Sequence, residues 1–207
     1  QSHLIYFTQY ANSYQRNLSD SNSRVNVEPT IFRTYSYNTG LSQVGYKNLF
    51  KTKLNGVDYN FGTEVAAFIS NLPRANGTSG LGEFSQNVGT DRLIVPALFA
   101  EAEKQLRQRL ILKASLRLDY IPQFNEPLAV QPHLTATYSF NKKWAAYGAY
   151  DRTASFIHRF RNGSLGSPFD APILANDKLP FSLADQVSTG VVFKQNAFKV
   201  STSIFYR

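Results

Sequence analysis

The chain has 207 residues with no cysteine or methionine, and its 22 basic and 14 acidic side chains give a formal net charge of +8. The absence of cysteine excludes disulfide bonds, cysteine-based metal sites and thiol catalysis. No run of about 18 apolar residues occurs, which excludes a transmembrane helix. The basic residues are scattered and form no nucleic-acid-binding motif. We therefore expect no nucleic-acid partner and expect anionic surroundings such as a lipid headgroup layer.

Segments in which apolar and polar residues alternate, or in which β-branched and aromatic residues are enriched, recur along the chain and predict β-strands. In chain order they are residues 2–10, 41–53, 57–70, 93–105, 110–120, 132–140, 144–153, 186–195 and 198–207.

Residues 110–120 show the alternation most clearly. Apolar side chains occupy the even positions from Leu110 to Tyr120, whereas Lys113, Arg117 and Asp119 occupy odd positions. Successive side chains of a strand point to opposite faces, so one face of this strand is apolar and the other is charged. The apolar positions span roughly 33 Å at ~3.3 Å per residue, which suits a tilted strand that crosses a bilayer.

Short and long connections alternate between these segments. The short ones are residues 54–56, 106–109, 141–143 and 196–197, and the first contains Asn55-Gly56, a strong signal for a tight hairpin turn. The long ones are residues 11–40, 71–92, 121–131 and 154–185, with 31–38 as a candidate extension of the second strand. In an up-and-down meander, this order places every long connection at one end of the sheet, as in outer-membrane barrels.

Aromatic residues add to this interpretation. Phe140, Trp144, Phe193 and Phe198 flank the short turns, and Tyr120, Tyr150 and Tyr206 lie near the opposite strand ends, where interfacial girdles of a membrane barrel belong. A soluble antiparallel sandwich also alternates apolar and polar positions, but it rarely needs so many long strands with one-sided loop length. The sequence predicts an all-β fold: an antiparallel up-and-down meander of about nine strands from a larger transmembrane β-barrel.

Several segments resemble strands of TonB-dependent outer-membrane receptors, and they occur in the same order. Residues 98–103 and 110–120 are similar to one hairpin of that family, in which Arg117, Asp119 and Tyr120 match the most recognisable positions. The resemblance covers roughly residues 42–207, and its style resembles Bacteroidetes members. The other similar segments are residues 55–64, 132–138, 144–152, 184–190 and 198–207.

The resemblance implies a receptor in the outer membrane of a Gram-negative bacterium. Such receptors import a bulky, scarce nutrient of the siderophore, haem, cobalamin or glycan class, driven by the TonB complex acting on a plug domain. Outer-membrane lipid and lipopolysaccharide would surround the barrel, and an extracellular small molecule or glycan would be the ligand. The alternatives are a passive porin or structural barrel, and a soluble β-sandwich binding module.

The sequence departs from the family in extent. Members carry a plug domain and a TonB-binding segment before a barrel of about 22 strands. Neither precedes the strands predicted here, so we expect residues 1–207 to be a partial barrel domain without plug domain or TonB box. The lack of methionine at position 1 also predicts a processed chain or a fragment.

Candidate ligand-binding residues gather where the last long connection leaves its strand: Arg152, His158, Arg159 and Arg161. Arginine offers planar, charge-assisted donors that suit carboxylate or catecholate oxygens. The alternative role for these arginines is that of solvated or lipopolysaccharide-facing charges, and a haem- or metal-ligand role for His158 competes with that of an ordinary loop histidine.

No catalytic motif is present, so we expect no enzyme activity, no catalytic residue, no metal site and no resident cofactor. Glu101 and Glu103 share the polar face of one strand and are predicted to pair with Lys113, Arg117 or a plug domain. His133 lies on the polar face of its strand and is predicted to point into the barrel lumen.

Overall fold

The computed structural model describes residues 1–20, 31–79, 82–87, 89–162, 169–195 and 198–207. All regular elements within these residues are β-strands. None of the described residues forms a helix that is long and apolar enough to cross a membrane. In chain order the strands are β1 (Ser2–Asp20), β2 (Ile31–Leu54), β3 (Val57–Ser79), β4 (Gly82–Asn87), β5 (Thr90–Leu106), β6 (Leu110–Tyr120), β7 (Leu128–Ser139), β8 (Trp144–Ser155), β9 (Ile157–Asn162), β10 (Phe169–Leu174), β11 (Ser182–Gln195) and β12 (Phe198–Tyr206).

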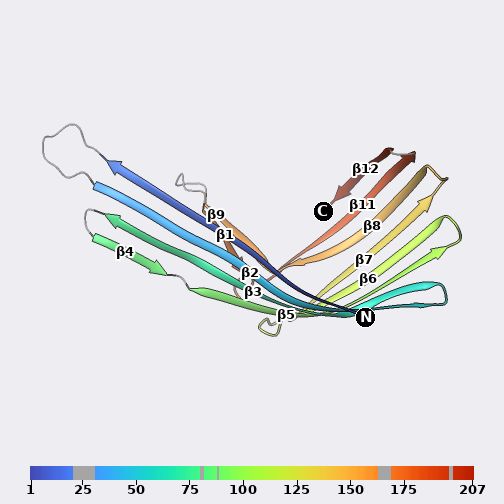
Figure 1. Cartoon of the computed structure of the whole chain (residues 1–207), viewed down its shortest axis with the longest axis horizontal. Coiled ribbons are helices and arrows are strands. Elements are labelled where there is room, and N and C mark those ends of the chain that lie inside the picture. The colour runs from blue at the N-terminus through green and yellow to red at the C-terminus, as the bar shows by residue number, and fades with distance from the viewer. Residues whose placement is uncertain (21–30, 80–81, 88, 163–168, 196–197) are drawn as a thin grey trace.

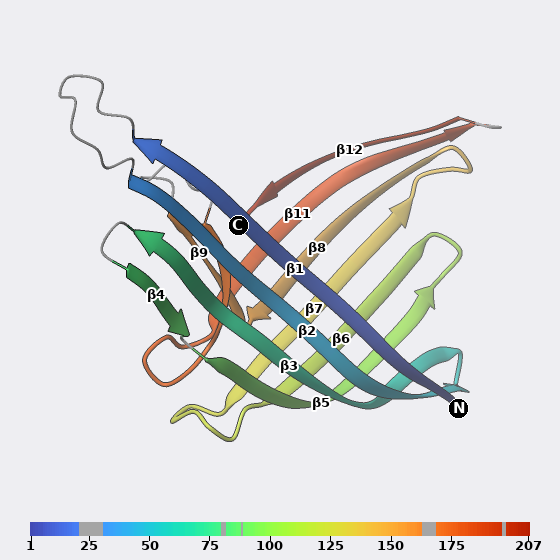
Figure 2. The same ribbon diagram turned by 60° about the vertical axis from the view of Figure 1, so that its left-hand side comes forward.

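The strands form one large antiparallel meander with the order β1-β2-β3-β5-β6-β7-β8-β11-β12, in which β1 and β12 are the edges. Strand β4 pairs only with β3, and β9 and β10 form a separate two-stranded hairpin. Figures 1 and 2 show an open, twisted and curved sheet with its short turns gathered at one end. The predicted all-β meander of about nine strands is confirmed.

The first strands are longer than the sequence predicts. Strand β1 continues to Asp20, β2 begins at Ile31 and β3 continues to Ser79, so much of the predicted connections 11–40 and 71–92 is strand. The assignment of 31–38 as an extension of the second strand is confirmed. Pairing requires only backbone donors and acceptors, so a strand can continue where the alternation of apolar and polar residues is lost.

The last two long connections also contain regular structure. The predicted connection 121–131 ends at β7, which begins at Leu128, so only residues 121–127 join β6 to β7. The predicted connection 154–185 contains the β9–β10 hairpin and the start of β11. Its glycine- and proline-rich composition marked the whole segment as irregular, although short hairpin strands need few residues each.

The two faces of the sheet differ in the way that the alternation predicts. On β6, Leu112 and Leu116 are exposed on what we call the outer face, whereas Asp119, on the opposite inner face, is only 1% exposed. The outer face of neighbouring strands is likewise apolar, with Leu98 and Leu134 exposed. Because each register is antiparallel and continuous over these strands, the outer face forms one apolar surface.

The turns and aromatic residues at the short-turn end follow the sequence pattern. Asn55 and Gly56 have φ angles of 52° and 72°, as a tight hairpin of type I′ requires. The rings of Trp144 and Phe193, which face each other across β8 and β11 beside the turn 141–143, lie 4.7 Å apart. Residues 196–197, the last predicted turn, lie outside the described residues.

The outer face is expected to tolerate no charge where lipid covers it. Leu116 lies midway along β6 and is 42% exposed, so Leu116→Arg should cost about 2–4 kcal/mol of unfolding free energy in a bilayer. Ser115→Arg, on the inner face, should cost much less. Urea unfolding of the complete protein in lipid vesicles measures both, and equal losses would contradict the assignment of faces.

Candidate functional site

A network of polar side chains crosses the inner face of the sheet. Tyr6 Oη donates a hydrogen bond to Glu64 Oε1 at 2.6 Å, and Gln43 Nε2 donates to Tyr6 Oη at 3.3 Å. Arg117 donates from Nη1 to Glu64 Oε2 at 2.6 Å and from Nε to Asp119 Oδ1 at 2.8 Å. Charge-assisted bonds of this kind are among the strongest in proteins, so the network ties β1, β2 and β3 to β6.

Gln131 extends the network to β7 and β8. Its Nε2 donates to the second carboxylate oxygen of Asp119, and its Oε1 accepts a hydrogen bond from the Ala154 backbone N–H at 2.9 Å. We call Tyr6, Gln43, Glu64, Arg117, Asp119 and Gln131 the inner polar network. It satisfies both oxygens of the buried Asp119 carboxylate, which is the condition for keeping such a charge away from water.

Small residues allow the inner polar network to span the sheet. Ala97 of β5 lies in register between Glu64 and Asp119, and its methyl side chain leaves room for Arg117 to reach Glu64 across that strand. Gly45 lies opposite Tyr6, and a Cβ atom at Gly45 would stand 2.1 Å from Cζ of the tyrosine ring. The tyrosine ring therefore lies over a glycine, a pairing that strands use where a large ring needs space.

Two smaller polar clusters lie nearer the short-turn end of the inner face. Glu101 accepts a hydrogen bond from Asn60 Nδ2 at 2.9 Å and forms an ion pair of 2.8 Å with Lys113, as predicted. Arg117, the other predicted partner of Glu101, pairs instead with carboxylates of the inner polar network.

The prediction that His133 lies on the inner, polar face is confirmed by its partners. Its Nδ1–H donates to Asp151 Oδ1 at 3.2 Å, and Nε2 shares a hydrogen bond of 3.0 Å with the Thr135 hydroxyl. Between the inner polar network and the short turns, the inner face is thus lined by paired donors and acceptors.

The inner face becomes apolar toward the long connections. A buried cluster there, which we call the mouth cluster, joins β3 and β5 to the connection 121–127 and to the end of β10. Its members are Ala66, Phe68, Leu93, Val95, Ile121, Phe124, Ala129, Leu174 and Ala175. Phe156 and Phe181 pack against it, and Phe181 lies edge-on to Phe124 with ring centroids 5.9 Å apart.

The β9–β10 hairpin covers this apolar region. Strand β10 packs against β2, β3 and β5, and the Ser70 hydroxyl of β3 donates a hydrogen bond of 2.5 Å to the Pro172 carbonyl. Ser70 and Leu174 are both fully buried. The hairpin is therefore fixed over the inner face by apolar packing and by a polar anchor, and it narrows the space in front of the sheet at the long-connection end.

The predicted ligand-binding residues do not form one cluster. Arg152 lies on the outward-facing parity of β8, where its Nε and Nη2 donate to the two carboxylate oxygens of Asp185 at 2.7 and 2.9 Å. Tyr150 Oη donates to the same carboxylate at 2.6 Å. Any ligand of Arg152 would compete with this bidentate pair, which joins β8 to β11.

The other three candidates lie on β9. His158 Nε2–H donates to the Pro180 carbonyl at 3.0 Å, and the Arg159 guanidinium lies 5.9 Å from the centroid of the Tyr10 ring of β1. Arg161 pairs through its backbone with Asp170 of β10, and its side chain lies outside the described part of the chain. The hairpin thus brings His158 and Arg159 to the long-connection end of the inner face, which we call the mouth. Arg152 lies apart from them on β8.

Sequence reasoning did not identify the mouth cluster. Ala66 and Phe68 occupy the polar parity of β3 directly after Glu64, and Leu93 and Val95 occupy the corresponding parity of β5. Apolar residues on a parity that is otherwise polar were the available signal for a second apolar region on the inner face.

Comparisons with known proteins match the chain to one family. The family model described as "TonB dependent receptor-like, beta-barrel" matches residues 2–207. No curated protein matches the chain. The siderophore receptor PirA from Pseudomonas aeruginosa is similar in structure, with a TM-score of 0.55 and 15% identity over 97% of this chain. The RagAB peptide transporter has a TM-score of 0.55 and 11% identity over 98% of this chain. The chain spans 39% of the first structure and 27% of the second.

The inner polar network is expected to be costly to break. Arg117→Leu would leave the buried Asp119 without its cation and should lower the unfolding free energy by about 3–5 kcal/mol. Lys113→Leu is the matched control, because its partner Glu101 is partly exposed and the pair should be worth about 1 kcal/mol or less. Urea unfolding compares the two, and an equal loss would show that the network adds no special stability.

Proposed function

Because this chain belongs to the TonB-dependent receptor-like β-barrel family, we propose that it forms part of the wall and mouth of an outer-membrane receptor. The receptor would import a bulky, scarce nutrient into a Gram-negative bacterium. The TonB complex would supply energy through a plug domain. The family is one of transport receptors and not of enzymes, and we assign no catalytic role to the described residues.

The observation that carries this proposal is the covered mouth. An open pore needs a wide, water-filled lumen lined by polar groups. Here the inner face is polar toward the short turns but apolar at the mouth cluster, and the β9–β10 hairpin packs over that cluster. Such a surface can hold part of a large ligand and restricts free diffusion, which favours a binding receptor over a passive porin.

The outer face argues against the soluble sandwich. A sandwich buries one face of each sheet against the other sheet, with a shared core about 10 Å thick. Here Leu98, Leu134 and Val187 are 59%, 52% and 57% exposed on the outer face, and no second sheet covers them within the described residues. Lipid is the environment that would cover so continuous an apolar surface.

For the ligand we propose an oxygen-rich anion that is recognised by bases of the hairpin. Arg159 and His158 are placed at the mouth by β9, and Arg161 follows in the same strand. The two similar structures are named as a siderophore receptor and a peptide transporter. Siderophores and peptide carboxylates both present oxygens that arginine binds well. A haem, cobalamin or glycan ligand would use the same mouth.

Replacing the hairpin bases tests this ligand class. Arg159→Gln combined with Arg161→Gln should weaken uptake of an anionic nutrient while leaving the surface abundance of the receptor unchanged, because the substitutions remove charge but keep a polar side chain. Growth of a receptor-dependent strain on the nutrient measures uptake, and surface labelling measures abundance.

Arg152→Gln is the matched control. Its guanidinium is held by Asp185 on the outward-facing parity, so the substitution should affect stability more than uptake. Loss of uptake in the Arg152 variant, with normal uptake in the hairpin variant, would place the ligand at Arg152 and overturn our assignment to the hairpin.

The proposed location predicts which turns face the cell exterior. An epitope inserted at Asn125, in the connection 121–127, should bind antibody on intact cells, because the long connections would be external. An epitope at Lys142, in a short turn, should bind only after the outer membrane is opened. Antibody binding in the reverse order would overturn the proposed orientation.

A further inference from the structure

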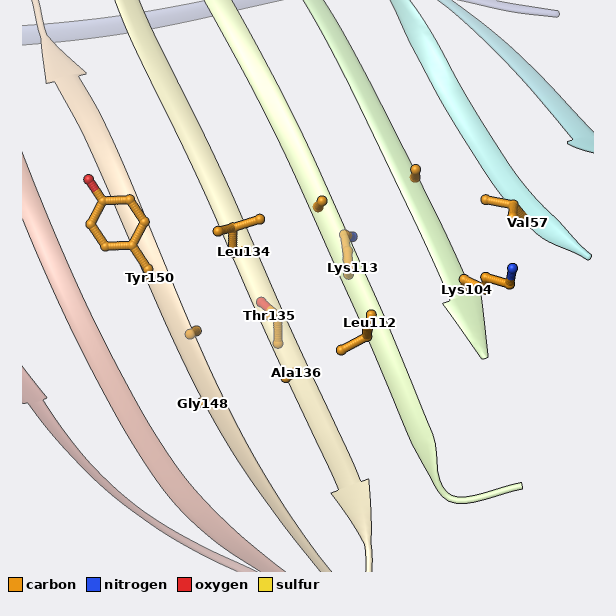
Figure 3. A pocket seen from close by; sticks show the side chains of 12 residues that line it. Val57, Lys104, Leu112, Lys113, Leu134, Thr135, Ala136, Gly148 and Tyr150 are labelled. Carbon is orange, nitrogen blue, oxygen red and sulfur yellow. The ribbon is translucent and has the colours of Figure 1, made fainter. Parts of the chain in front are cut away.

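A groove lies on the outer face across β5, β6, β7 and β8, at some distance from the mouth. It is a hollow of about 400 Å³, and nearly all of the surface that lines it is apolar. Figure 3 shows Leu112 and Leu134 at its centre, Tyr150 at one side, and Val57 and Lys104 at the other.

Small side chains create the groove. Ala102 pairs with Ala114 across β5 and β6, and Ala136 pairs with Gly148 across β7 and β8. A Cβ atom added at Gly148 would meet no other atom within 4 Å, so the space above this position is open. The exposed side chains of Leu112 and Leu134 stand between these small residues and form its walls. The result is an open, shallow hollow with an apolar lining.

The short turns at one end of the groove are strongly basic. Segments 104–109 and 141–143 contain five basic residues and no acidic residue: Lys104, Arg107, Arg109, Lys142 and Lys143. We call these five residues the basic rim. All are exposed, and none forms an ion pair within the part of the chain that the structure describes. The nearest acids of β5, Glu101 and Glu103, lie on the inner parity, and Glu101 forms an ion pair there with Lys113.

We propose that the groove and the basic rim together bind one anionic glycerophospholipid of the membrane leaflet that faces the short turns. One acyl chain would lie in the groove, because the lining is apolar and lies on the face that we propose to be in lipid. The phosphate would be held by Lys104 and by the arginines of the β5–β6 turn, which supply charge-assisted donors. The proposal rests on the proposed function only through the membrane location of the outer face.

The spacing along the strands fits a single lipid. Lys104 is part of the groove wall and lies directly opposite Leu112. Arg109 precedes Leu112 by a few residues, roughly 10 Å at ~3.3 Å per residue. A lysine with its stem on apolar surface and its ammonium at the boundary is favoured where lipid chains meet their headgroups. The groove and the charges therefore follow each other in the order of chain and phosphate in one lipid molecule.

The test uses the complete receptor in nanodiscs of phosphatidylcholine that contain a minor fraction of phosphatidylglycerol. Native mass spectrometry counts the lipids retained by each released receptor. The unmodified receptor should retain phosphatidylglycerol in preference to phosphatidylcholine. Arg107→Gln and Arg109→Gln should each lower this retention about fivefold, the effect of one basic residue near an anionic surface. Ala136→Phe should abolish the retention by filling the groove.

Matched controls separate a defined site from general attraction. Lys199→Gln removes a charge beside another short turn, and Ala67→Phe adds a ring to the outer face of β3; both should leave retention unchanged. Equal losses in the controls, retention without headgroup preference, or recovery of lipid A or a bound protein instead would overturn the proposal. A receptor that inserts and transports normally but retains no phosphatidylglycerol refutes only this lipid site. A receptor that does not enter nanodiscs refutes the membrane location as well.

Discussion

Antiparallel backbone pairing joins each strand of the sheet to its neighbours, and this pairing decides on which face each side chain lies. Side chains alternate between faces, so the pairing of Tyr6 with Gly45, of Glu64 with Ala97 and of Ala97 with Asp119 puts Tyr6, Glu64 and Asp119 on the same face although they are far apart in sequence. A slip of one residue between two strands would exchange the faces beyond that point. It would expose charge to the apolar side and separate the inner polar network.

Because the faces are fixed in this way, the inner face can combine features that would conflict elsewhere. Apolar residues of the mouth cluster exclude water near Asp119, which raises the cost of an unpaired carboxylate there. Arg117 and Gln131 offset that cost by binding the carboxylate, and Arg117 also reaches Glu64 across β5 because Ala97 has only a methyl side chain. The polar network and the apolar mouth are therefore one structure. The hydrogen bonds of the inner polar network join the strands of the sheet next to the region where the β9–β10 hairpin packs.

The alternation in residues 110–120 and the Asn55-Gly56 turn were enough to predict the strand type, the faces and the meander, because these depend on local geometry and on burial of one face. The ends of β1, β2 and β3 could not be predicted, since backbone pairing continues there and backbone pairing by itself leaves no pattern in the sequence. The partners of Arg117 were also out of reach. Glu64 is 53 positions away in sequence, and nothing local distinguishes it from Glu101 as a partner. The hairpin was hidden because glycine and proline mark turns without showing where a short strand packs.

The basic residues that give the net charge of +8 acquire distinct surroundings only when the chain folds. In the sequence the basic residues are scattered and suggest only a preference for anionic surroundings. The meander sorts them. The β5–β6 and β7–β8 turns, which contain Arg107 and Lys142, come to the same end of the sheet. Strand β9 carries His158 and Arg159 to the opposite, long-connection end. Positive charge at the two ends faces different chemistry, because one set borders an apolar groove on the outer face and the other borders the apolar mouth on the inner face. In our two proposals the same residue types would therefore bind a lipid at one end and a soluble ligand at the other, and only their place in the sheet distinguishes them.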